Sequence, residues 1–415
     1  MMTATKNGAS ARFETLSEDL LDATGTGPLT GLVVADFSRV LAGPYCTMLL
    51  ADMGATVIKV ESPAGDDTRA WMPPVRDGES TYYLSINRNK RSIALDFNDP
   101  DDLQVAQEIA RRADVLVENF KPGGLTKYGL DYPAVTAGNP EVIYASITGF
   151  GTAGGASLPG YDLLVQAMSG LMSVTGGPDT SPFRSGVAVF DVMTGLHASI
   201  GILAALHDRN DSGKGQLVEL NLMSSALSGM VNQTGGYLLS GTVPQRMGND
   251  HPSLYPYEPF PTKDGDIVIA IGNDGQFRKL CNALQAGHLA DDPRFSAAPE
   301  RSRNRAELRP LLQELLANQT AVEWFEILTA ARIPCGPIND VRGGIEFAEQ
   351  IGLEPVVTVG HGTEAVPGIR HPVAFSRTPA GYDLAPPALD GDREAILSWV
   401  RTPTVSLPAD ALRRS

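Results

Sequence analysis

Short apolar runs alternate with amphipathic stretches from residue 31 onward. The apolar runs have the length of strands, whereas the amphipathic stretches carry apolar residues at helical spacing. The alternation predicts strands at 32–37, 56–61, 114–120 and 141–150, and helices at 45–54, at 99–113 and between the last two strands. Strands that are apolar almost throughout and alternate with helices are typical of a parallel sheet covered on both faces. We therefore expect an α/β fold with a doubly wound parallel sheet.

The alternation of apolar runs and amphipathic stretches ends after residue 230, and a passage that contains glycine and proline follows. A second unit starts with the apolar run 265–272 and continues into two long helical stretches. The stretch IPCGPINDV, 333–341, suggests a linker that returns to the first unit, and a helix at 392–400 is too isolated to form its own core. The expected domains are a polar tail (1–28), a large domain (29–235), a linker with a small domain (236–340), and a C-terminal segment (341–415).

The composition is that of an ordinary soluble protein. The chain has 415 residues, of which 42% are hydrophobic and 20% charged, and its length favours two domains. A net charge of −15 repels nucleic acid and anionic membranes. No apolar run approaches the roughly 20 residues of a membrane span, and the first residues lack an apolar signal core. The three cysteines, Cys46, Cys281 and Cys335, are far apart, which suits a reducing, cytoplasmic compartment.

Several stretches resemble known functional motifs, but the residues around them do not fit those motifs. GFGTAG, 149–154, matches a dinucleotide fingerprint, but more glycines and a proline follow where a helix must open. DSGKGQ, 211–216, lacks the first glycine and the final serine or threonine of a phosphate loop. The six histidines show no paired metal spacing, and no serine stands in a G-x-S-x-G elbow. Dinucleotide, metal and serine-hydrolase chemistry are therefore disfavoured.

One carboxylate stands alone in an apolar passage. Asp191 follows the run Gly186-Val187-Ala188-Val189-Phe190 and precedes a stretch with helical pattern that extends to Leu206. An aspartate at the start of a helix accepts hydrogen bonds from the unpaired N–H groups of the first turn. On this local pattern alone, an N-cap is favoured over a catalytic role.

Two basic clusters stand out against the acidic background. One is NRNKR, 87–91, and the other is Lys121 with Lys127, just past the end of a predicted strand. Ligands bind at strand ends in open parallel sheets, and lysines there are suited to phosphates. On composition alone, a solvated surface is the expectation for both clusters. Tyr161 and Asp162, in PGYD, precede another helix, where core packing and capping are the ordinary roles.

Taken together, these stretches resemble the family III CoA-transferases. The resemblance covers nearly all of the chain after the tail and rests on the motifs DFSRVLAGPYCTMLLADMGATVIKVE, YYLSINRNKRSIALDF, ADVLVENFKPGGLTKYGLDY, VIYASITGFG, PGYDLLVQAMSGLM, SGKGQLVELNL and IPCGPIND. In that family the catalytic residue is an aspartate between a short apolar run and a helix that contains glycine. The matching position is Asp191.

The resemblance also implies an architecture and a set of ligands. Two chains interlock as a homodimer, each with a Rossmann-like large domain, a smaller α+β domain and a C-terminal segment that returns to the large one. Coenzyme A is substrate and product, no cofactor is tightly bound, and the partners are acyl-CoA and carboxylic acids. By the resemblance, the CoA contacts are Val40, Leu41, Ala42, Leu95, Asp96, Phe97, Asn119, Phe120, Lys121, Lys127 and Tyr161. Lys121 and Lys127 would face the CoA phosphates.

The chemistry explains why a carboxylate is needed. An aspartate can attack an acyl-CoA to give a mixed anhydride and then an aspartyl-CoA thioester, which conserves the thioester's free energy. With an ordinary pKa of about 3.9, it is ionised at neutral pH without a base, and a helix N-terminus favours the anion further. The cap and nucleophile interpretations of Asp191 are thus compatible.

The resemblance points to dicarboxylate substrates within the family. Leu41, Ser62 and Asn98 depart from the formyl-CoA/oxalate branch, which has Gln, Arg and Lys there. The stretch 65–94 is similar instead to members that handle succinyl or glutaryl groups. Arg69 or Arg88 is a candidate to hold a distal carboxylate, with surface solvation as the equal alternative for each.

Two other functions remain open at this point. An α-methylacyl-CoA racemase shares the fold but has a histidine where this chain has Tyr161, and tyrosine is a poor proton shuttle at neutral pH. A noncatalytic acyl-CoA-binding protein would carry the same binding residues, so only an activity assay separates it from an enzyme.

Overall fold

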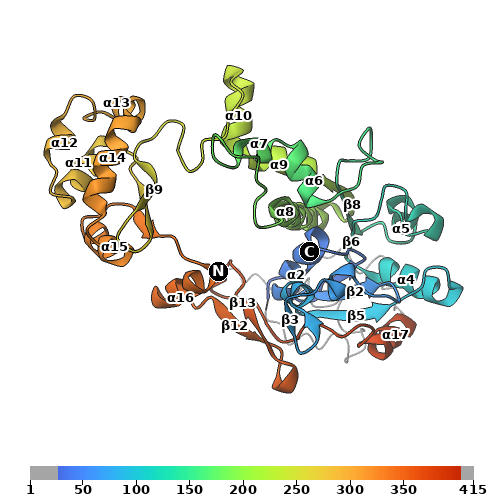
Figure 1. Ribbon diagram of the computed structural model, residues 1–415. Coiled ribbons are helices and arrows are strands. Elements are labelled where there is room, and N and C mark those ends of the chain that lie inside the picture. Colours follow the sequence, from blue (N-terminus) through green and yellow to red (C-terminus); the bar gives the residue numbers. More distant parts are fainter. Residues whose placement is uncertain (1–26, 403–415) are drawn as a thin grey trace, which may run out of the picture. The chain divides into compact units, whose positions relative to one another are not determined.

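The computed structural model describes residues 27–402 and divides them between two compact units (Figure 1). The first unit comprises the chain up to Ser169, Gly186–Thr234 and the chain from Glu354; the second comprises Gly170–Ser185 and Gly235–Leu353. Of the polar tail expected at 1–28, residues 1–26 lie outside the described residues. The units differ from the expected domains in three places, since 170–185, 235 and 341–353 belong to the second unit.

The first unit is built on a six-stranded sheet with the strand order β5-β2-β1-β6-β7-β8. Every pairing in this sheet is parallel, as the apolar strands predict. The chain starts in the middle with β1 and β2, extends to one edge with β5, and then builds the other side. The strands are β1 (Val33–Asp36), β2 (Thr56–Glu61), β5 (Lys90–Ala94), β6 (Val115–Glu118), β7 (Ile143–Thr148) and β8 (Gln216–Asn221).

Helices cover both faces of this sheet. On one face, α4 and α17 share a core with the strands through Ile109 and Trp399. Leu217 of β8 packs against this core, so the next residue, Val218, points to the opposite face of the sheet. Gly201 of α8 lies close to Val218, which places α8 on that opposite face. The helices of the unit are α2 (Ala42–Asp52), α3 (Thr81–Ile86), α4 (Pro100–Arg112), α5 (Tyr132–Gly138), α6 (Asp162–Met168), α8 (Val189–Ser212), α9 (Leu222–Gly229) and α17 (Arg393–Arg401).

Shorter elements join the helices and strands of this unit. They are the 3-10 helices η2 (Asp67–Ala70), η3 (Thr126–Tyr128) and η4 (Gly362–Glu364), the hairpin of β3 (Val75–Arg76) with β4 (Glu79–Ser80), and that of β12 (Val356–Val359) with β13 (Val366–Ile369). Residues 149–158 form turns with no helix after the GFGTAG motif. The rejection of a dinucleotide fingerprint is consistent with this loop.

The helix α8 is long and apolar enough, by length and composition, to cross a membrane, and no other helix in the described part of the chain is. This differs from the expectation that no apolar run approaches the length of a membrane span. Phe190, Ala198 and Ile202 of α8 are nevertheless buried against the rest of the first unit. A core helix of a layered α/β protein passes the same test, because it too is apolar over most of its length.

The second unit has its own small sheet and core. Its three strands are antiparallel in the order β11-β10-β9, and the helices α11, α14 and α15 pack on them through Phe277, Leu312 and Trp324. Its strands and helices are β9 (Tyr257–Pro261), β10 (Asp266–Ala270), β11 (Cys335–Pro337), α7 (Leu171–Val174), α11 (Asp274–Ala283), α12 (His288–Asp291), α13 (Ala298–Arg303), α14 (Arg305–Leu316), α15 (Ala321–Ala330) and α16 (Val341–Gln350). The helix α10 (Val231–Ser240) runs across the boundary of the two units.

The stretch 333–341 was expected to be a linker, but part of it is a strand of this sheet. Its residues Cys335–Pro337 form the edge strand β11, which pairs with β10 from Ile269 to Ile267. A three-residue strand ending in proline gives too little alternation to be seen in sequence, and proline is tolerated because an edge strand has one free side.

The C-terminal segment completes the first unit, as its lack of a separate core predicts. Trp399 and Ile396 of α17 are buried in the core beneath the sheet. The side chains of Asp390 and Asp392 accept hydrogen bonds from the backbone N–H groups of Ala94 and Ser92. These bonds cover the exposed edge of β5, which would otherwise offer unpaired groups to another strand.

The basic cluster at 87–91 is a buried ionic network, which corrects the expectation of a solvated surface. Lys90 donates to Asp36 at 3.0 Å, and both side chains are fully buried. Arg88 pairs with Asp52 at 2.7 Å with only 6% of its side chain exposed. Fully buried charges are tolerated only when they are paired and hydrogen-bonded, so these contacts hold β1, α2 and β5 in one arrangement.

Candidate active site

The residues that the resemblance assigns to CoA come together at one edge of the large sheet. Residues 40–42 follow β1, residues 95–97 follow β5, and residues 119–121 follow β6, so all lie beyond carboxyl ends of parallel strands. Tyr161 lies in the segment after β7 and is 64% exposed. The strand order reverses between β1 and β6, and such a point is where open α/β sheets form a ligand crevice.

The two sides of this reversal are bridged by one side chain. Asn119, after β6, accepts a hydrogen bond from the N–H of Arg39 at 3.0 Å and donates to the carbonyl of the same residue at 2.7 Å. The next residue, Val40, has a φ of 69°, which is left-handed. A β-branched residue adopts that conformation only when its surroundings enforce it. The turn that enters α2 is therefore built tightly into the edge of the sheet.

The helix α8 begins two residues before Asp191, which corrects the N-cap interpretation. The N-cap position is Ala188, with no side-chain cap, and Asp191 is the third residue of the helix. Among the described residues, no donor bonds its carboxylate. The side chain of Asp191 is thus an unengaged acid in the first turn of a helix.

The first turn of α8 is capped from another helix. Asp162, the first residue of α6, accepts hydrogen bonds from the N–H groups of Phe190 at 2.8 Å and Asp191 at 3.2 Å. Its other oxygen accepts from the side-chain amide of Gln166. Asp162 was expected to cap its own helix; instead it holds the turn that carries Asp191.

The environment of Asp191 suppresses its ionisation. Burial, followed by the nearby charge of Asp162, raises the pKa of Asp191 to about 7. The sequence-based expectation of an ordinary acidic pKa is therefore wrong. Asp162 takes up the amide groups that would otherwise stabilise the Asp191 anion, so the helix N-terminus gives less help than position alone suggests.

The helix of Asp191 packs closely on the start of α2. A Cβ atom at Gly195, one turn beyond Asp191, would lie 2.7 Å from the carbonyl oxygen of Ala42. Glycine therefore permits an approach that any side chain would prevent. This contact brings the first turns of α8 close to residues 41 and 42, which the resemblance assigns to CoA.

An open hollow next to α3 also belongs to this region. It has a volume of about 590 Å³ and is lined by Trp71, Met72, Pro73, Pro74, Thr81, Tyr82 and Ser85. Burial and the negative charge of Asp191 raise the pKa of Tyr82 to about 12, with smaller contributions from Asp162 and Asp66. Tyr82 thus stays protonated, and its hydroxyl is available as a hydrogen-bond donor near Asp191.

The remaining predicted contacts differ in what they offer a ligand. Lys121 and Lys127 are exposed, and the ammonium of Lys127 lies 4.4 Å from the ring centre of Tyr128. Phe97 stacks edge-on to Tyr128 at 5.3 Å, whereas Leu95 is buried. The other members of the set are Asp96 and Phe120, which are half-buried. Exposed cations beside aromatic rings are suited to a phosphorylated nucleotide.

Arg69 and Arg88, the candidates for a distal carboxylate, are engaged inside the protein. Arg69 donates two hydrogen bonds of 2.8 Å to Glu61 and stacks on the ring of Tyr83 at 3.8 Å. Arg88 is held by Asp52 as described above. Both guanidinium groups are neutralised by internal carboxylates, so neither is free to bind substrate.

The supporting residues of the site were not predicted from the sequence. Lys59 stands in the middle of the apolar strand TVIKVE, and its ammonium bonds Asp66 at 2.9 Å with both side chains buried. A lysine inside an otherwise apolar strand was the available signal for a buried ion pair. Tyr82 and Gly195 carried no local signal, because their importance depends on contacts with distant segments.

No cluster of ligands that could hold a metal ion is present within residues 27–402. The site consists instead of one free carboxylate, a capping carboxylate, a strained turn and a hollow lined mainly by apolar and aromatic residues. These groups are suited to nucleophilic attack by a carboxylate on a bound acyl compound.

Comparison with known proteins assigns the family. The sequence model of CoA-transferase family III matches residues 29–393. The succinate–glutarate CoA-transferase of Agrobacterium fabrum is 44% identical over 392 residues, which cover 90% of this chain and 96% of the relative. The succinyl-CoA:glutarate CoA-transferase of Mus musculus is 41% identical, with 91% of this chain and 88% of the relative covered.

A solved structure agrees with these relatives. A CAIB/BAIF family protein from Brucella suis superimposes with a TM-score of 0.82 at 42% sequence identity, covering 90% of this chain and 99% of that one. The family match spans most of the chain, and the relatives are similar over nearly their whole length. The chain belongs to CoA-transferase family III, and it is an enzyme of that family.

Proposed function

We propose that this enzyme moves CoA from succinyl-CoA or a related dicarboxylyl-CoA to a carboxylic acid, with Asp191 as the nucleophile. The observation that carries the assignment of Asp191 is its carboxylate, which accepts no hydrogen bond within the described chain although it is half-buried in the first turn of α8, the helix that packs on Ala42 through Gly195. A nucleophile needs free lone pairs and a fixed position. The hydrogen bonds that Asp162 accepts from the first turn of α8 fix the position of Asp191.

The reaction proceeds in four steps. The Asp191 carboxylate attacks the acyl-CoA carbonyl, and CoA leaves as a thiolate, which gives a mixed anhydride. The thiolate attacks the Asp191 carbonyl of that anhydride, releases the donor acid and forms an aspartyl-CoA thioester. The acceptor carboxylate attacks this thioester and displaces the thiolate again. The thiolate then attacks the acceptor's acyl carbon, which yields the new acyl-CoA and restores Asp191.

The CoA moiety binds across the carboxyl edge of the sheet in this proposal. The turn at 40–42, the segment 95–97 and the segment 119–121 contribute mainly backbone atoms near β1, β5 and β6. Lys121 and Lys127 meet the phosphates, which supplies positive charge on a chain of net charge −15. Tyr161, exposed at the start of α6, closes the site beside Asp191.

The substrate prediction is tested by a matrix of CoA esters against carboxylic acids, read by mass spectrometry. We expect succinyl-CoA to be a donor and glutarate or another C4–C6 diacid to be an acceptor, because relatives at 44% and 41% identity are named for that exchange. The wild-type protein without acceptor is the control for hydrolysis. Efficient transfer to formate or oxalate, with none to diacids, would overturn the proposal.

A homodimer is part of the same proposal, because the first unit leaves an apolar helix face uncovered. Leu196, Ile200 and Leu203 of α8 are exposed and lie at helical spacing on one side, with Ile200 63% exposed. The helices α6 and α9, which pack on α8, also carry exposed apolar residues; they include Leu163, Met168 and Leu227. A second copy of the chain is the occupant that we propose for this face.

Light scattering is expected to show a dimer at micromolar concentration. Ile200→Glu places a charge in the centre of the apolar face and is expected to shift the protein to monomer. Val322→Glu is the matched control, since Val322 is 59% exposed on the separate helix α15, and it is expected to leave the dimer unchanged. A wild-type monomer would contradict the proposal.

A further inference from the structure

The turn at 38–40 is held in place by side chains at every residue. Asp36 accepts a hydrogen bond from the N–H of Ser38 at 3.0 Å, and Lys59 donates to the carbonyl of Ser38 at 3.1 Å. Asn119 bonds both backbone groups of Arg39, as described above. These contacts indicate that the surrounding side chains, and not the turn's own residues, determine the conformation of the turn.

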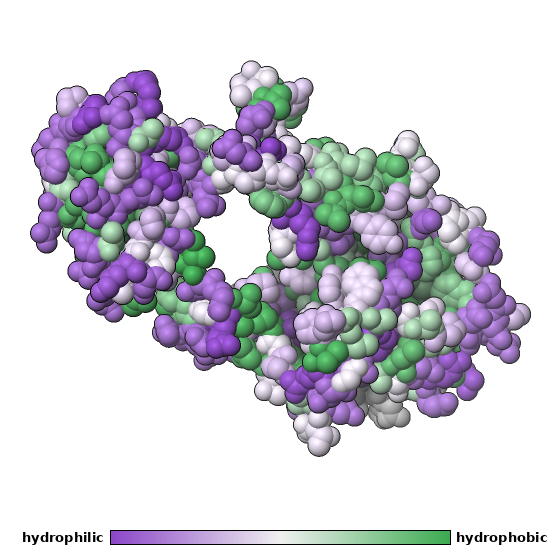
Figure 2. Space-filling view, in the orientation of Figure 1, coloured by the Kyte–Doolittle hydropathy of each residue, from purple (hydrophilic) through white to green (hydrophobic). Residues whose placement is uncertain are grey.

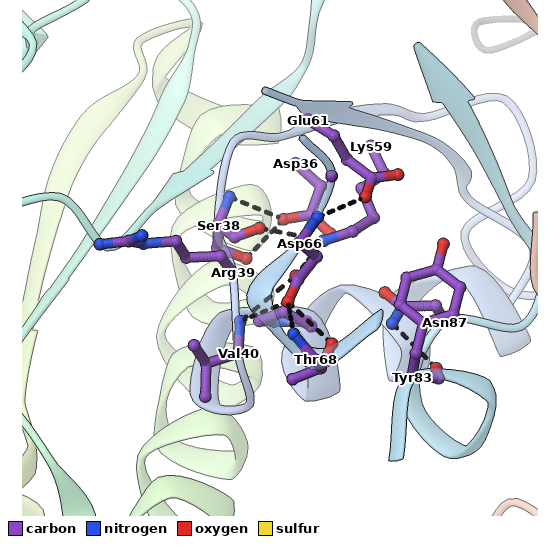
Figure 3. A network of polar contacts seen from close by, with 12 residues as sticks. Asp36, Ser38, Arg39, Val40, Lys59, Glu61, Asp66, Thr68, Tyr83 and Asn87 are labelled. Carbon is purple, nitrogen blue, oxygen red and sulfur yellow. Dashed lines mark hydrogen bonds and ion pairs between the residues drawn. The ribbon is translucent and has the colours of Figure 1, made fainter. Parts of the chain in front are cut away.

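Asp66 holds the strained end of this turn (Figure 3). Both of its carboxylate oxygens lie 3.3 Å from the N–H of Val40, the residue with left-handed backbone. The same carboxylate accepts from Lys59 at 2.9 Å and from the N–H and hydroxyl of Thr68 at 2.9 and 2.8 Å. The two ends of the turn are therefore hydrogen-bonded to one ion pair: Lys59 bonds Ser38, and Asp66 bonds Val40.

The pair itself is fixed by burial. The side chains of Lys59 and Asp66 are 1% and 0% exposed. The N–H of Asp66 donates to Glu61 at 2.9 Å, so the loop after β2 is tied back to its own strand. A carboxylate with this many donors cannot rotate away, and Val40 is left with one arrangement.

We propose that Asp66, held by Lys59, is a positioning residue for the binding of the CoA ester. It stabilises the left-handed turn at Val40 and so presents the backbone of residues 40–42 to CoA before the ligand arrives. The proposal rests on the proposed function, because that function places CoA at this turn. Asp66 touches no substrate; it acts through Val40.

The test compares two buried carboxylates. Asp66→Ala removes the bond to Val40 and leaves Lys59 without this partner, whereas Asp52→Ala, the matched control, removes the buried partner of Arg88 far from the turn. Both variants are expected to unfold at lower temperature. Only Asp66→Ala is expected to raise the KM for acyl-CoA and the Kd for free CoA, each about tenfold, with kcat within about twofold of wild type.

A second background separates positioning from general destabilisation. Glycine adopts the conformation of Val40 without strain, so in a Val40→Gly background the Asp66→Ala change is expected to alter KM by less than about threefold. If Asp66→Ala does not fold, Asp66→Asn serves in its place, with a rise in KM of about threefold expected in the Val40 background.

Three outcomes would overturn the proposal: equal rises in KM for the Asp66 and Asp52 variants, an unchanged KM in a folded Asp66 variant, or an undiminished effect in the Val40→Gly background. Calorimetric binding of free CoA gives the same comparison without turnover. Failure of the proposed function is a separate result, since it would appear as a wild-type enzyme that transfers no CoA to any acid.

Discussion

Replacement of Asp191 by asparagine is expected to lower CoA transfer by at least about a thousandfold, while the protein stays folded and keeps its affinity for CoA. Asparagine has the shape of aspartate but no anionic oxygen to attack the thioester. Because the Asp191 carboxylate caps nothing, its loss removes no structural hydrogen bond. Transfer is measured by mass spectrometry, and CoA affinity by calorimetry.

The covalent intermediate gives a direct readout for this prediction. Hydroxylamine added during turnover is expected to convert the activated Asp191 carboxyl to a hydroxamate, which peptide mass mapping locates. Asp208→Asn is the matched control, since Asp208 is an exposed acid on the same helix, and it is expected to remain active. A folded Asp191→Ala or Asp191→Asn enzyme with near wild-type turnover would remove Asp191 from the mechanism.

The same substitution is expected to raise the stability of the protein above neutral pH. The pKa of Asp191 is about 7 in the folded protein against an ordinary value of 3.8, so the folded state binds the proton more tightly. The free energy of unfolding therefore decreases as the pH rises from the ordinary pKa of aspartate to the raised pKa of folded Asp191, and the loss is complete by about pH 8. The melting temperature of the Asp191→Asn variant is expected to exceed that of wild type at pH 8 and to match it near pH 4.

Catalytic efficiency is expected to fall steeply below neutral pH. Because the carboxylate is the nucleophile and its pKa is about 7, kcat/KM should drop about tenfold per pH unit on the acid side and about a hundredfold at pH 5. An unperturbed aspartate would show no such loss until about pH 4. Initial rates from pH 5 to pH 9 measure the profile.

Asp162→Asn is expected to move this profile to lower pH by up to about one unit. The amide keeps an oxygen for the N–H groups of Phe190 and Asp191 but removes the charge that opposes ionisation of Asp191. Burial, the larger cause, remains. A 3′-dephospho-CoA ester serves as the control, because a phosphate monoester also titrates near pH 6. A flat wild-type profile down to pH 5 would contradict the raised pKa.

The positions of the segments that we propose to bind CoA were predictable because they depend on chain order. The carboxyl ends of the strands in a parallel sheet lie on one edge, so the residues after β1, β5 and β6 share that edge whatever their side chains. Asp191 was also identifiable, since a lone acid in an apolar passage is visible in sequence and matches the family's motif.

The supporting contacts were not predictable, because they join residues that are far apart in the chain. Asp162 caps a turn 28 and 29 positions away, and Lys90 pairs with Asp36 across 54 positions. Local composition made 87–91 look like a solvated cluster and made Asp162 look like a cap for its own helix. Burial reverses both interpretations, since a charge inside the protein must find its partner wherever the fold places one.

The sequence by itself therefore determined the alternation of strands and helices, the parallel sheet, the family and the candidate nucleophile, all of which follow from local patterns. The tertiary structure alone decided where α8 begins, how strongly Asp191 resists ionisation, that Arg69 and Arg88 are unavailable to substrate, and that Val40 is held in a left-handed turn. Those properties depend on desolvation and on partners brought together by folding, and neither is written in the neighbouring residues.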